Sequence, residues 1–185
     1  MGNIAKMKIG VFYGSTTGNT ERVALKIAAE LAPYVSLVRD VADITAEEFA
    51  SVDVLLLGAS TWDIGELQHD WAAALPLLED ADLTGKTIAM FGLGDAFTYS
   101  WNYLDCLGEL HESLDGRGAT FVGLWPTEGY EFDESRALTG DDQFLGLGLD
   151  DDNQPELTDT RLYAWLAKVW AELEQLQLVP LRGAA

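Results

Sequence analysis

The feature that most constrains the fold is the run VDVLLL at residues 52–57, which is almost continuously apolar. A strand with one face in water alternates apolar and polar residues, whereas a strand covered on both faces does not need to. Similar short apolar runs occur at 8–12 and 87–91, and segments with helical spacing of apolar residues lie between the runs. Strands that alternate with helices predict a doubly wound α/β sheet with helices on both faces.

The same periodicity predicts the remaining elements. Strands are expected at 8–12, 36–41, 52–57, 87–91 and 121–125, and helices at 20–31, near 45–48, at 67–78, at 102–114 and at 158–176. Segment 127–148 is too long for an ordinary connection, so we expect it to fold back as an insertion whose apolar end, 144–149, completes the last strand. Ligands of such sheets bind at the carboxyl ends of the strands, where loops 13–20, 58–65 and 92–101 are expected.

A length of 185 residues fits one domain over 1–185, with an N-terminal extension at 1–6 and a tail at 179–185. The single cysteine, Cys106, excludes an intramolecular disulfide and a cysteine-ligated metal site, and no metal is expected. We find neither a signal peptide nor a stretch near the roughly 18 apolar residues of a membrane span. We therefore expect a cytoplasmic monomer.

The charge of the chain limits its partners. There are 31 acidic and 11 basic residues, which give a formal net charge of -20 and a pI near 4.1. Such a field repels nucleic acid and anionic membranes and attracts basic protein surfaces. Halophilic adaptation is the alternative explanation, although an apolar fraction of 48% does not favour it.

The stretch GSTTGNT at 14–20 joins the first expected strand to the first expected helix. Its glycines expose backbone N–H groups at the positive end of a helix dipole, and these groups hold a phosphate without a cation. It matches neither GxxxxGK followed by Ser or Thr nor GxGxxG, so a phosphate monoester is the better prediction. A plain turn with hydroxyl caps is the structural alternative. Further donors come from Ser15, Thr16, Thr17, Asn19 and Thr20.

Three stretches together resemble the flavin mononucleotide (FMN) loops of flavodoxins, namely GSTTGNT at 14–20, STWDIGEL at 60–67 and GLGDAFTYSWNYLD at 92–105. Their order and spacing agree with that family from about residue 7 to the last helix. The insertion, with TEGYEF and GLGLDDDNQ, is similar to that of long-chain flavodoxins. The resemblance implies a flavodoxin-like five-stranded parallel sheet of order 2-1-3-4-5 and non-covalently bound FMN.

The resemblance also implies which residues bind FMN. The phosphate loop comprises Ser15, Thr16, Thr17, Gly18, Asn19 and Thr20. The second loop comprises Ser60, Thr61, Trp62, Asp63, Ile64 and Gly65. The third loop and the segments after it contribute Leu93, Gly94, Asp95, Tyr99, Asn102 and Asp150.

Several of these residues have implied roles. Trp62 and Tyr99 correspond to the two aromatics that flank the flavin ring. Asp95, the Gly94 backbone and Asn102 correspond to positions at the pyrimidine edge. The Asp63-Ile64 peptide corresponds to the one that turns toward flavin N5, and Asp150 to an acid near the ribityl chain.

Structural alternatives remain for three of these residues. Trp62 could be a core tryptophan, and Asp95 could be a turn residue. Phe97, Trp101 or Tyr103 could take the stacking role given to Tyr99.

The implied function is that of a low-potential one-electron carrier that cycles FMN between semiquinone and hydroquinone. It would shuttle electrons between a basic-surfaced ferredoxin/flavodoxin-NADP reductase and an acceptor protein. No catalytic residue is identified, because His69 is expected at the surface, His111 beside the core and Cys106 as a packing residue. The acids are expected to lower the potential and to orient partners.

Two other classes of protein are alternatives to an electron carrier. An FMN-dependent NAD(P)H:quinone or nitro reductase would need a face of the ring open to substrate, which Trp62 and Tyr99 would cover. A receiver-type signalling module would need an acidic pair after the first strand, where this chain has Phe12-Tyr13-Gly14. Trp101 is a further large aromatic that could shield the ring edge and change partner choice.

Overall fold

The apolar runs form one mostly parallel sheet in the computed structural model, which describes residues 7–140 and 142–178. The expected extension at 1–6 and tail at 179–185 lie outside these residues. The strands of this sheet are β1 (Ile9–Tyr13), β2 (Val35–Asp40), β3 (Val54–Trp62), β4 (Glu66–Leu67), β5 (Thr87–Leu93), β6 (Thr120–Val122) and β9 (Leu147–Leu149). A separate antiparallel pair is formed by β7 (Trp125–Pro126) and β8 (Gln143–Phe144).

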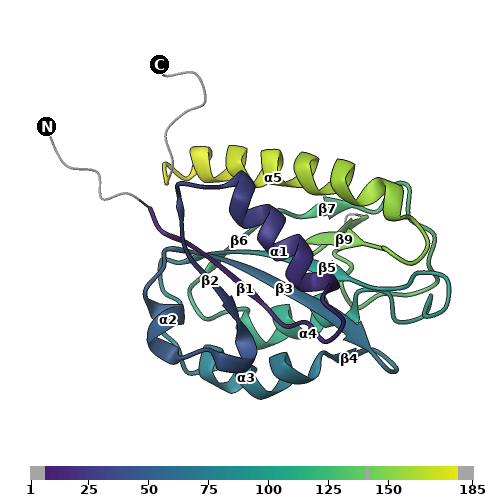
Figure 1. The fold of residues 1–185 in the computed structure, drawn as a ribbon, viewed down its shortest axis with the longest axis horizontal. Helices are drawn as coiled ribbons and strands as arrows, with labels where there is room; N and C mark the ends of the chain where they lie inside the picture. Colours follow the sequence, from purple (N-terminus) through teal and green to yellow (C-terminus); the bar gives the residue numbers. More distant parts are fainter. Residues whose placement is uncertain (1–6, 141, 179–185) are drawn as a thin grey trace, which may run out of the picture.

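Within the described residues, five α-helices cover the sheet, and two short 3-10 helices precede α2 and α5. The α-helices are α1 (Asn19–Glu30), α2 (Ala46–Ala50), α3 (His69–Glu79), α4 (Asp105–Leu114) and α5 (Thr158–Gln175), and the 3-10 helices are η1 (Val41–Asp43) and η2 (Pro155–Leu157). Figure 1 shows α1 and α5 on one face of the sheet and α2, α3 and α4 on the other. None of the helices in the described ranges is long and apolar enough to cross a membrane.

The strand order is β2-β1-β3-β5-β6, which confirms the expected order 2-1-3-4-5. The last position is shared by two strands. β6 pairs with the first half of β5, at residues 87–89, and β9 pairs with its second half, at residues 91–93. The chain between β6 and β9 contains β7 and β8, as expected for an insertion in the last strand.

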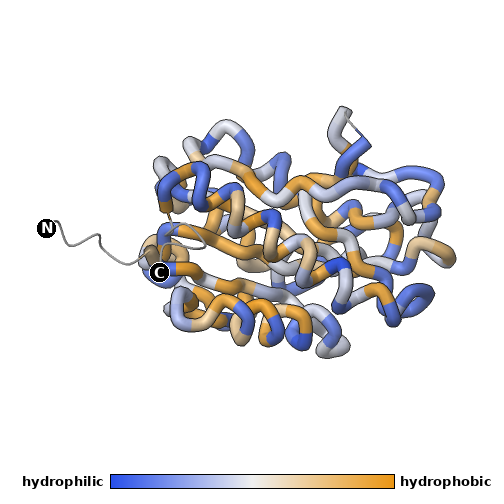
Figure 2. The backbone as a smooth tube through the Cα atoms, turned by 90° about the horizontal axis from the view of Figure 1, so that it is seen from above, coloured by the Kyte–Doolittle hydropathy of each residue, from blue (hydrophilic) through white to orange (hydrophobic). Residues whose placement is uncertain are grey.

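The apolar run in β3 is buried on both sides, because successive side chains of a strand point to opposite faces. Val54 and Leu56 pack in the core under α1 and α5, whereas Leu55 and Leu57 pack in the core over α3 and α4. Figure 2 shows apolar residues concentrated in the inner segments of the molecule, with hydrophilic residues frequent in the outer loops.

Some boundaries differ from the sequence-based expectation. The loop expected at 58–65 is shorter, because β3 continues to Trp62 and pairs with β4 in a hairpin that leaves Asp63–Gly65 as the turn. Likewise, β5 continues through Gly92 to Leu93 because β9 supplies a partner there. The helix expected from residue 102 begins at Asp105, since residues 96–104 form turns and a bend.

Substitution of Gly146 tests the pairing of β9 with β5. A Cβ atom at Gly146 would lie 2.2 Å from the Met90 carbonyl oxygen, whereas a Cβ atom at Gly140 meets nothing within 4 Å. We expect Gly146→Ala to lower the free energy of unfolding by about 1–3 kcal/mol. Gly140→Ala should change it by less than about 0.5 kcal/mol. Urea denaturation measures both, and equal stabilities of the two variants would contradict the close approach.

Candidate functional site

A cleft of about 390 Å³ lies at the carboxyl ends of β1, β3 and β5. It is lined by residues from all three loops that the sequence singled out, together with two acids from the segment after β9. The predicted residues in its walls are Thr17, Asn19, Thr20, Ser60, Thr61, Trp62, Asp63, Leu93, Gly94, Asp95 and Tyr99, and the two additional acids are Asp151 and Asp152.

One end of the cleft is the N-terminus of α1. Gly18 precedes this helix with a φ of 85°, and it has no side chain to cap the N–H groups of the first turn. Four N–H groups at a helix start have no partner within the helix, and they carry the positive end of the helix dipole. This end of the cleft is therefore suited to an anion.

Two hydroxyls of this loop are held so that their hydrogens are free. The Gly18 N–H donates to Ser15 Oγ at 3.1 Å, and Gln68 Nε2 donates to Thr16 Oγ1 at 3.1 Å. Because each oxygen already accepts an internal hydrogen bond, each hydroxyl can donate its own hydrogen outward. Ser15 and Thr16 can thus add donors near the start of α1, although neither they nor Gly18 line the cleft.

Gln68 connects the first loop to α3. Its Oε1 accepts from the N–H groups of Asp70 and Trp71 at 3.1 and 3.2 Å, and its Nε2 donates to Thr16 Oγ1 at 3.1 Å and to Asp70 Oδ2 at 2.7 Å. Gly14 packs against it so closely that a Cβ atom there would lie 2.3 Å from Oε1. Gln68 was not among the predicted residues, because its contacts join segments far apart in the chain.

The other end of the cleft carries two aromatic side chains. Trp62 is 37% exposed and Tyr99 is 50% exposed, and both line the cleft. Trp62 Nε1 donates to Ser60 Oγ at 2.9 Å, which fixes the indole at the end of β3. Neither side chain is part of the core, so the alternative of a core tryptophan at Trp62 is wrong.

The turn of the second loop is packed on the start of α4. Asp63 and Gly65 have φ values of 47° and 84°. A Cβ atom at Gly65 would lie 2.5 Å from a carboxylate oxygen of Asp105, so only glycine fits. Ile64, between them, is almost fully exposed. Asn102 faces this junction, where its Nδ2 donates to Asp105 Oδ2 at 3.1 Å, and it does not line the cleft.

The third loop is shaped by two carboxylates. Asp95 Oδ1 accepts from the N–H groups of Phe97 and Thr98 at 3.0 and 2.7 Å, so Asp95 does serve as a turn residue. Asp150 is buried and accepts from the Ala96 N–H at 3.0 Å. Asn153 Nδ2 donates to both acids, at 2.9 Å to Asp95 and at 2.8 and 3.0 Å to Asp150, and so reduces their mutual repulsion.

The wall acids Asp151 and Asp152 were not predicted. Asp151 forms an ion pair with Arg22 of α1, a contact across 129 positions that no local pattern signals. Partial burial, and then repulsion from Asp95, Asp150 and Asp151, raises the pKa of Asp152. Partial burial also acts to raise the pKa of Asp95, but hydrogen bonds from Thr98, Asn153 and Phe97 outweigh it and the pKa is lowered.

The groups considered as catalytic candidates lie away from the cleft. His69 is exposed at the start of α3, and the His111 ring packs on Phe121 at 4.6 Å between centroids. Cys106 is buried, and burial raises the pKa of its thiol to about 12. Within the described residues, no three His, Cys, Asp or Glu side chains are placed to hold a metal ion.

Comparison with known proteins identifies the family. A sequence model of flavodoxins matches residues 11–165. The chain belongs to the flavodoxin family. A flavodoxin of Klebsiella pneumoniae is 46% identical over 165 residues, which cover 89% of this chain and 94% of the relative. A flavodoxin of Synechocystis is 43% identical over 163 residues, with 88% and 95% covered.

The fold agrees with solved flavodoxin structures. Fusobacterium nucleatum flavodoxin bound to flavin mononucleotide matches with a TM-score of 0.84 at 29% identity, over 89% of this chain and 98% of that one. A mutant of the same flavodoxin, also bound to flavin mononucleotide, matches with a TM-score of 0.83 at 30% identity.

The opposite pKa shifts of Asp152 and Asp95 predict opposite effects on stability. The raised pKa of Asp152 means that its charged form destabilises the fold. Asp152→Asn should therefore stabilise the protein at pH 7. This advantage should disappear as the pH falls through the folded pKa toward the unfolded value of about 3.9. The lowered pKa of Asp95 predicts the reverse, so that Asp95→Asn destabilises at pH 7 and the difference is lost in acid.

Urea denaturation between pH 3 and 7 measures both effects, with Glu30→Gln at the far end of α1 as a control for removing one charge. If both substitutions at the cleft moved stability in the same direction at pH 7, the electrostatic account of these two acids would be wrong.

Proposed function

We propose that this chain binds FMN non-covalently in the cleft and carries single electrons between a reductase and an acceptor protein. The observation that carries the proposal is the pairing of an uncapped helix start at one end of the cleft with two partly exposed aromatic side chains at the other. The chain belongs to the flavodoxin family, and solved flavodoxin structures that match it contain bound FMN; both facts support the proposal.

The chemistry of the donors fits the phosphate of FMN. Backbone N–H groups at the start of α1 and the free hydrogens of Ser15 and Thr16 provide donors for its oxygens. Asn19 and Thr20 stand in the same wall and can add donors. Arg22, one turn into the helix, is already paired with Asp151, so the phosphate is held mainly by dipoles.

The aromatic end fits the flat ring of FMN. Trp62 and Tyr99 come from different loops, and a ring between them would be covered on both faces while one edge stays open. Bound FMN would supply a group that takes up and releases electrons one at a time. An open flavin edge allows electron transfer to another protein, whereas covered flavin faces leave no place for a substrate to stack. This argues against a quinone or nitro reductase.

The carboxylates near the cleft would make reduction harder. Asp63, Asp95 and Asp152 stand in its walls, none of the lining residues is a Lys or Arg, and Arg22 is paired with the wall residue Asp151. One negative charge at ~12 Å in a water-like medium contributes roughly 0.3 kcal/mol. That energy corresponds to on the order of 15 mV for one electron. We therefore propose a low-potential carrier whose potential is lowered by many acids together.

We further propose that the carrier acts in the cytoplasm as a monomer. A lone buried cysteine fits a reducing compartment. Its partners would have basic surfaces, as a ferredoxin/flavodoxin-NADP reductase could, because the formal charge of -20 favours association with such surfaces.

Loss of either aromatic should weaken FMN binding. Stacking on a flat ring contributes about 1–3 kcal/mol, so Trp62→Leu and Tyr99→Leu should each raise the dissociation constant by about 5- to 150-fold. Tyr163→Leu, at an exposed tyrosine of α5, is the matched control and should have no effect. Quenching of FMN fluorescence on titration measures the three constants. A colourless protein that takes up no FMN, or steady NAD(P)H turnover by the isolated protein, would contradict the proposal.

The hydrogen bond from Gln68 to Thr16 should affect the binding of FMN more than that of riboflavin, because it acts on the phosphate. Gln68→Glu keeps an acceptor for the Asp70 and Trp71 N–H groups, but it removes the amide donor to Thr16 Oγ1 and to Asp70 Oδ2. The new carboxylate faces that of Asp70, and it offers Thr16 an oxygen that competes for the hydroxyl hydrogen. Losing one hydrogen bond to a charged group costs about 1.5–3 kcal/mol, so FMN affinity should fall by about 10- to 150-fold. Riboflavin, which has no phosphate, should bind to the variant as it binds to the wild type.

Thr16→Val should give the same selective loss, and the double variant should lose no more than either single one. Thr160→Val, on the exposed side of α5, serves as the control. Equal losses for FMN and riboflavin would show that Gln68 acts on folding and not on the phosphate.

A further inference from the structure

Two exposed aromatic side chains stand beside the cleft without lining it. Phe97 is 84% exposed and Trp101 is 62% exposed, and they flank Tyr99 in the third loop. Apolar side chains stabilise a fold by leaving water, so these two contribute little to the folding of this chain. Exposed apolar patches with a polar rim mark interaction sites.

The loop that carries Phe97 and Trp101 is firmly held. The Ser100 carbonyl accepts from the N–H groups of Asp133 and Glu134 at 2.8 and 3.0 Å, and Ser100 Oγ donates to Asp133 Oδ2 at 2.5 Å. At the start of the loop, the Tyr99 N–H donates to the Asp95 carbonyl at 3.0 Å. Aromatic side chains on a loop that is already ordered lose little entropy when a partner binds them.

A hollow of about 720 Å³ opens next to Phe97, between the third loop and residues 131–133. Its walls combine the rings of Phe97 and Phe132 with the carboxylates of Glu131 and Asp133, and none of its lining residues is a Lys or Arg. On the other side of Ser100, Trp101 lines a second hollow that also includes Asp133. The two aromatics therefore flank one acidic segment.

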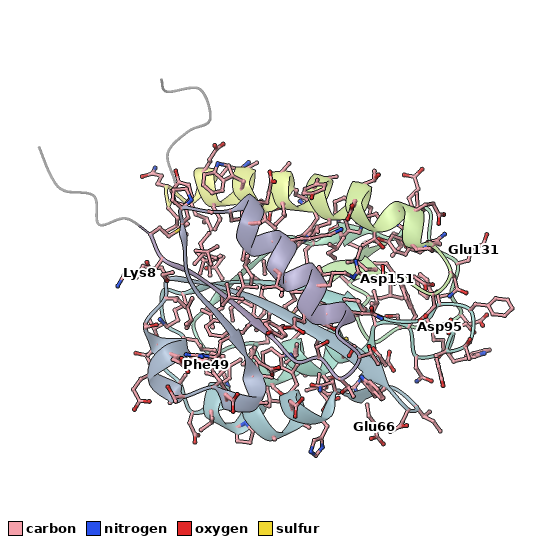
Figure 3. The ribbon with its side chains drawn as sticks, viewed as in Figure 1. Lys8, Phe49, Glu66, Asp95, Glu131 and Asp151 are labelled. Carbon is pink, nitrogen blue, oxygen red and sulfur yellow. The ribbon has the colours of Figure 1, made fainter. Side chains whose placement is uncertain are left out.

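The chemistry of the first hollow suits a cationic side chain. Arginine and lysine bind both to carboxylates and over the faces of aromatic rings. The chain makes such a contact internally, because the guanidinium carbon of Arg161 lies 3.8 Å from the centre of the Tyr130 ring. Figure 3 shows the labelled acids Asp95, Glu131 and Asp151 together at the same end of the molecule.

We propose that Phe97, Trp101 and the hollow beside Glu131 and Asp133 form a docking site for a basic redox protein. An apolar patch of the partner covers the two aromatics, and a Lys or Arg side chain from its basic rim enters the hollow. The inference rests on the proposed function. It places the partner beside the third loop, so that Tyr99 can stay on the flavin while the partner is bound.

Electron transfer to a basic haem protein tests this site. The reduced, FMN-loaded protein is mixed with ferric mitochondrial cytochrome c in a stopped-flow instrument over a range of salt concentrations. In each productive encounter one electron leaves the flavin and one ferric haem iron becomes ferrous. Phe97→Ser and Trp101→Ser should each lower the second-order rate constant by about 5- to 10-fold, with an unchanged salt dependence.

Removal of the Glu131 charge should change the salt dependence of the rate constant, which the aromatic substitutions leave unchanged. Glu131→Gln should lower the rate constant at low salt and flatten its salt dependence. The matched controls are Leu25→Ser on α1 and Tyr163→Ser on α5 for the aromatics, and Glu47→Gln on α2 for the charge. All three residues lie outside the described hollows around the third loop and should leave the rate constant unchanged.

The FMN dissociation constant of each variant distinguishes a failure of the docking site from a failure of the proposed function. It should be the same in every variant, because none of the substituted side chains lines the cleft and none is hydrogen-bonded to the phosphate loop in the described structure. Rate constants of the Phe97 and Trp101 variants equal to that of the wild type would overturn the docking site and leave the proposed function standing. A wild-type protein that fails to bind FMN would overturn both.

Discussion

The arrangement of this molecule depends on the burial of β3 on both of its faces. Because Val54 and Leu56 pack toward α1 and α5 while Leu55 and Leu57 pack toward α3 and α4, neither face of the strand can meet water. A strand buried in this way needs parallel neighbours joined by helices. The carboxyl ends of β1, β3 and β5 then meet at one edge, and the loops that follow them enclose a single cleft.

The cleft is suited to an anion although carboxylates surround it, because the donors at the start of α1 are dipoles and not charged side chains. The start of α1 and two hydroxyls provide donors without a net charge, while Arg22 is paired with the wall residue Asp151. Asp95 and Asp150 are kept close by Asn153, which donates to both. The same acids that would disfavour electron uptake by a bound flavin would also attract a basic partner.

Most helices and strands could be predicted from the sequence, because the spacing and the length of the apolar runs indicate which segments are buried and whether they are helical or extended. The positions of α1 and of the central strands follow this pattern, whereas the strand order is implied by the resemblance to flavodoxins. The extension of β3 to Trp62 and the late start of α4 depend on pairing and turns that local spacing does not encode. Gln68, Asn153 and the Arg22–Asp151 pair act through contacts distant in sequence, so motif spacing alone could not find them.

The central claim is that backbone N–H groups at the start of α1 hold the phosphate of FMN. Hydrogen exchange of the amides of residues 15–20, measured with FMN and with riboflavin, tests it most directly. The account predicts that FMN slows exchange at these amides and that riboflavin does not. Exchange that is unchanged by FMN, or slowed equally by riboflavin, would contradict it.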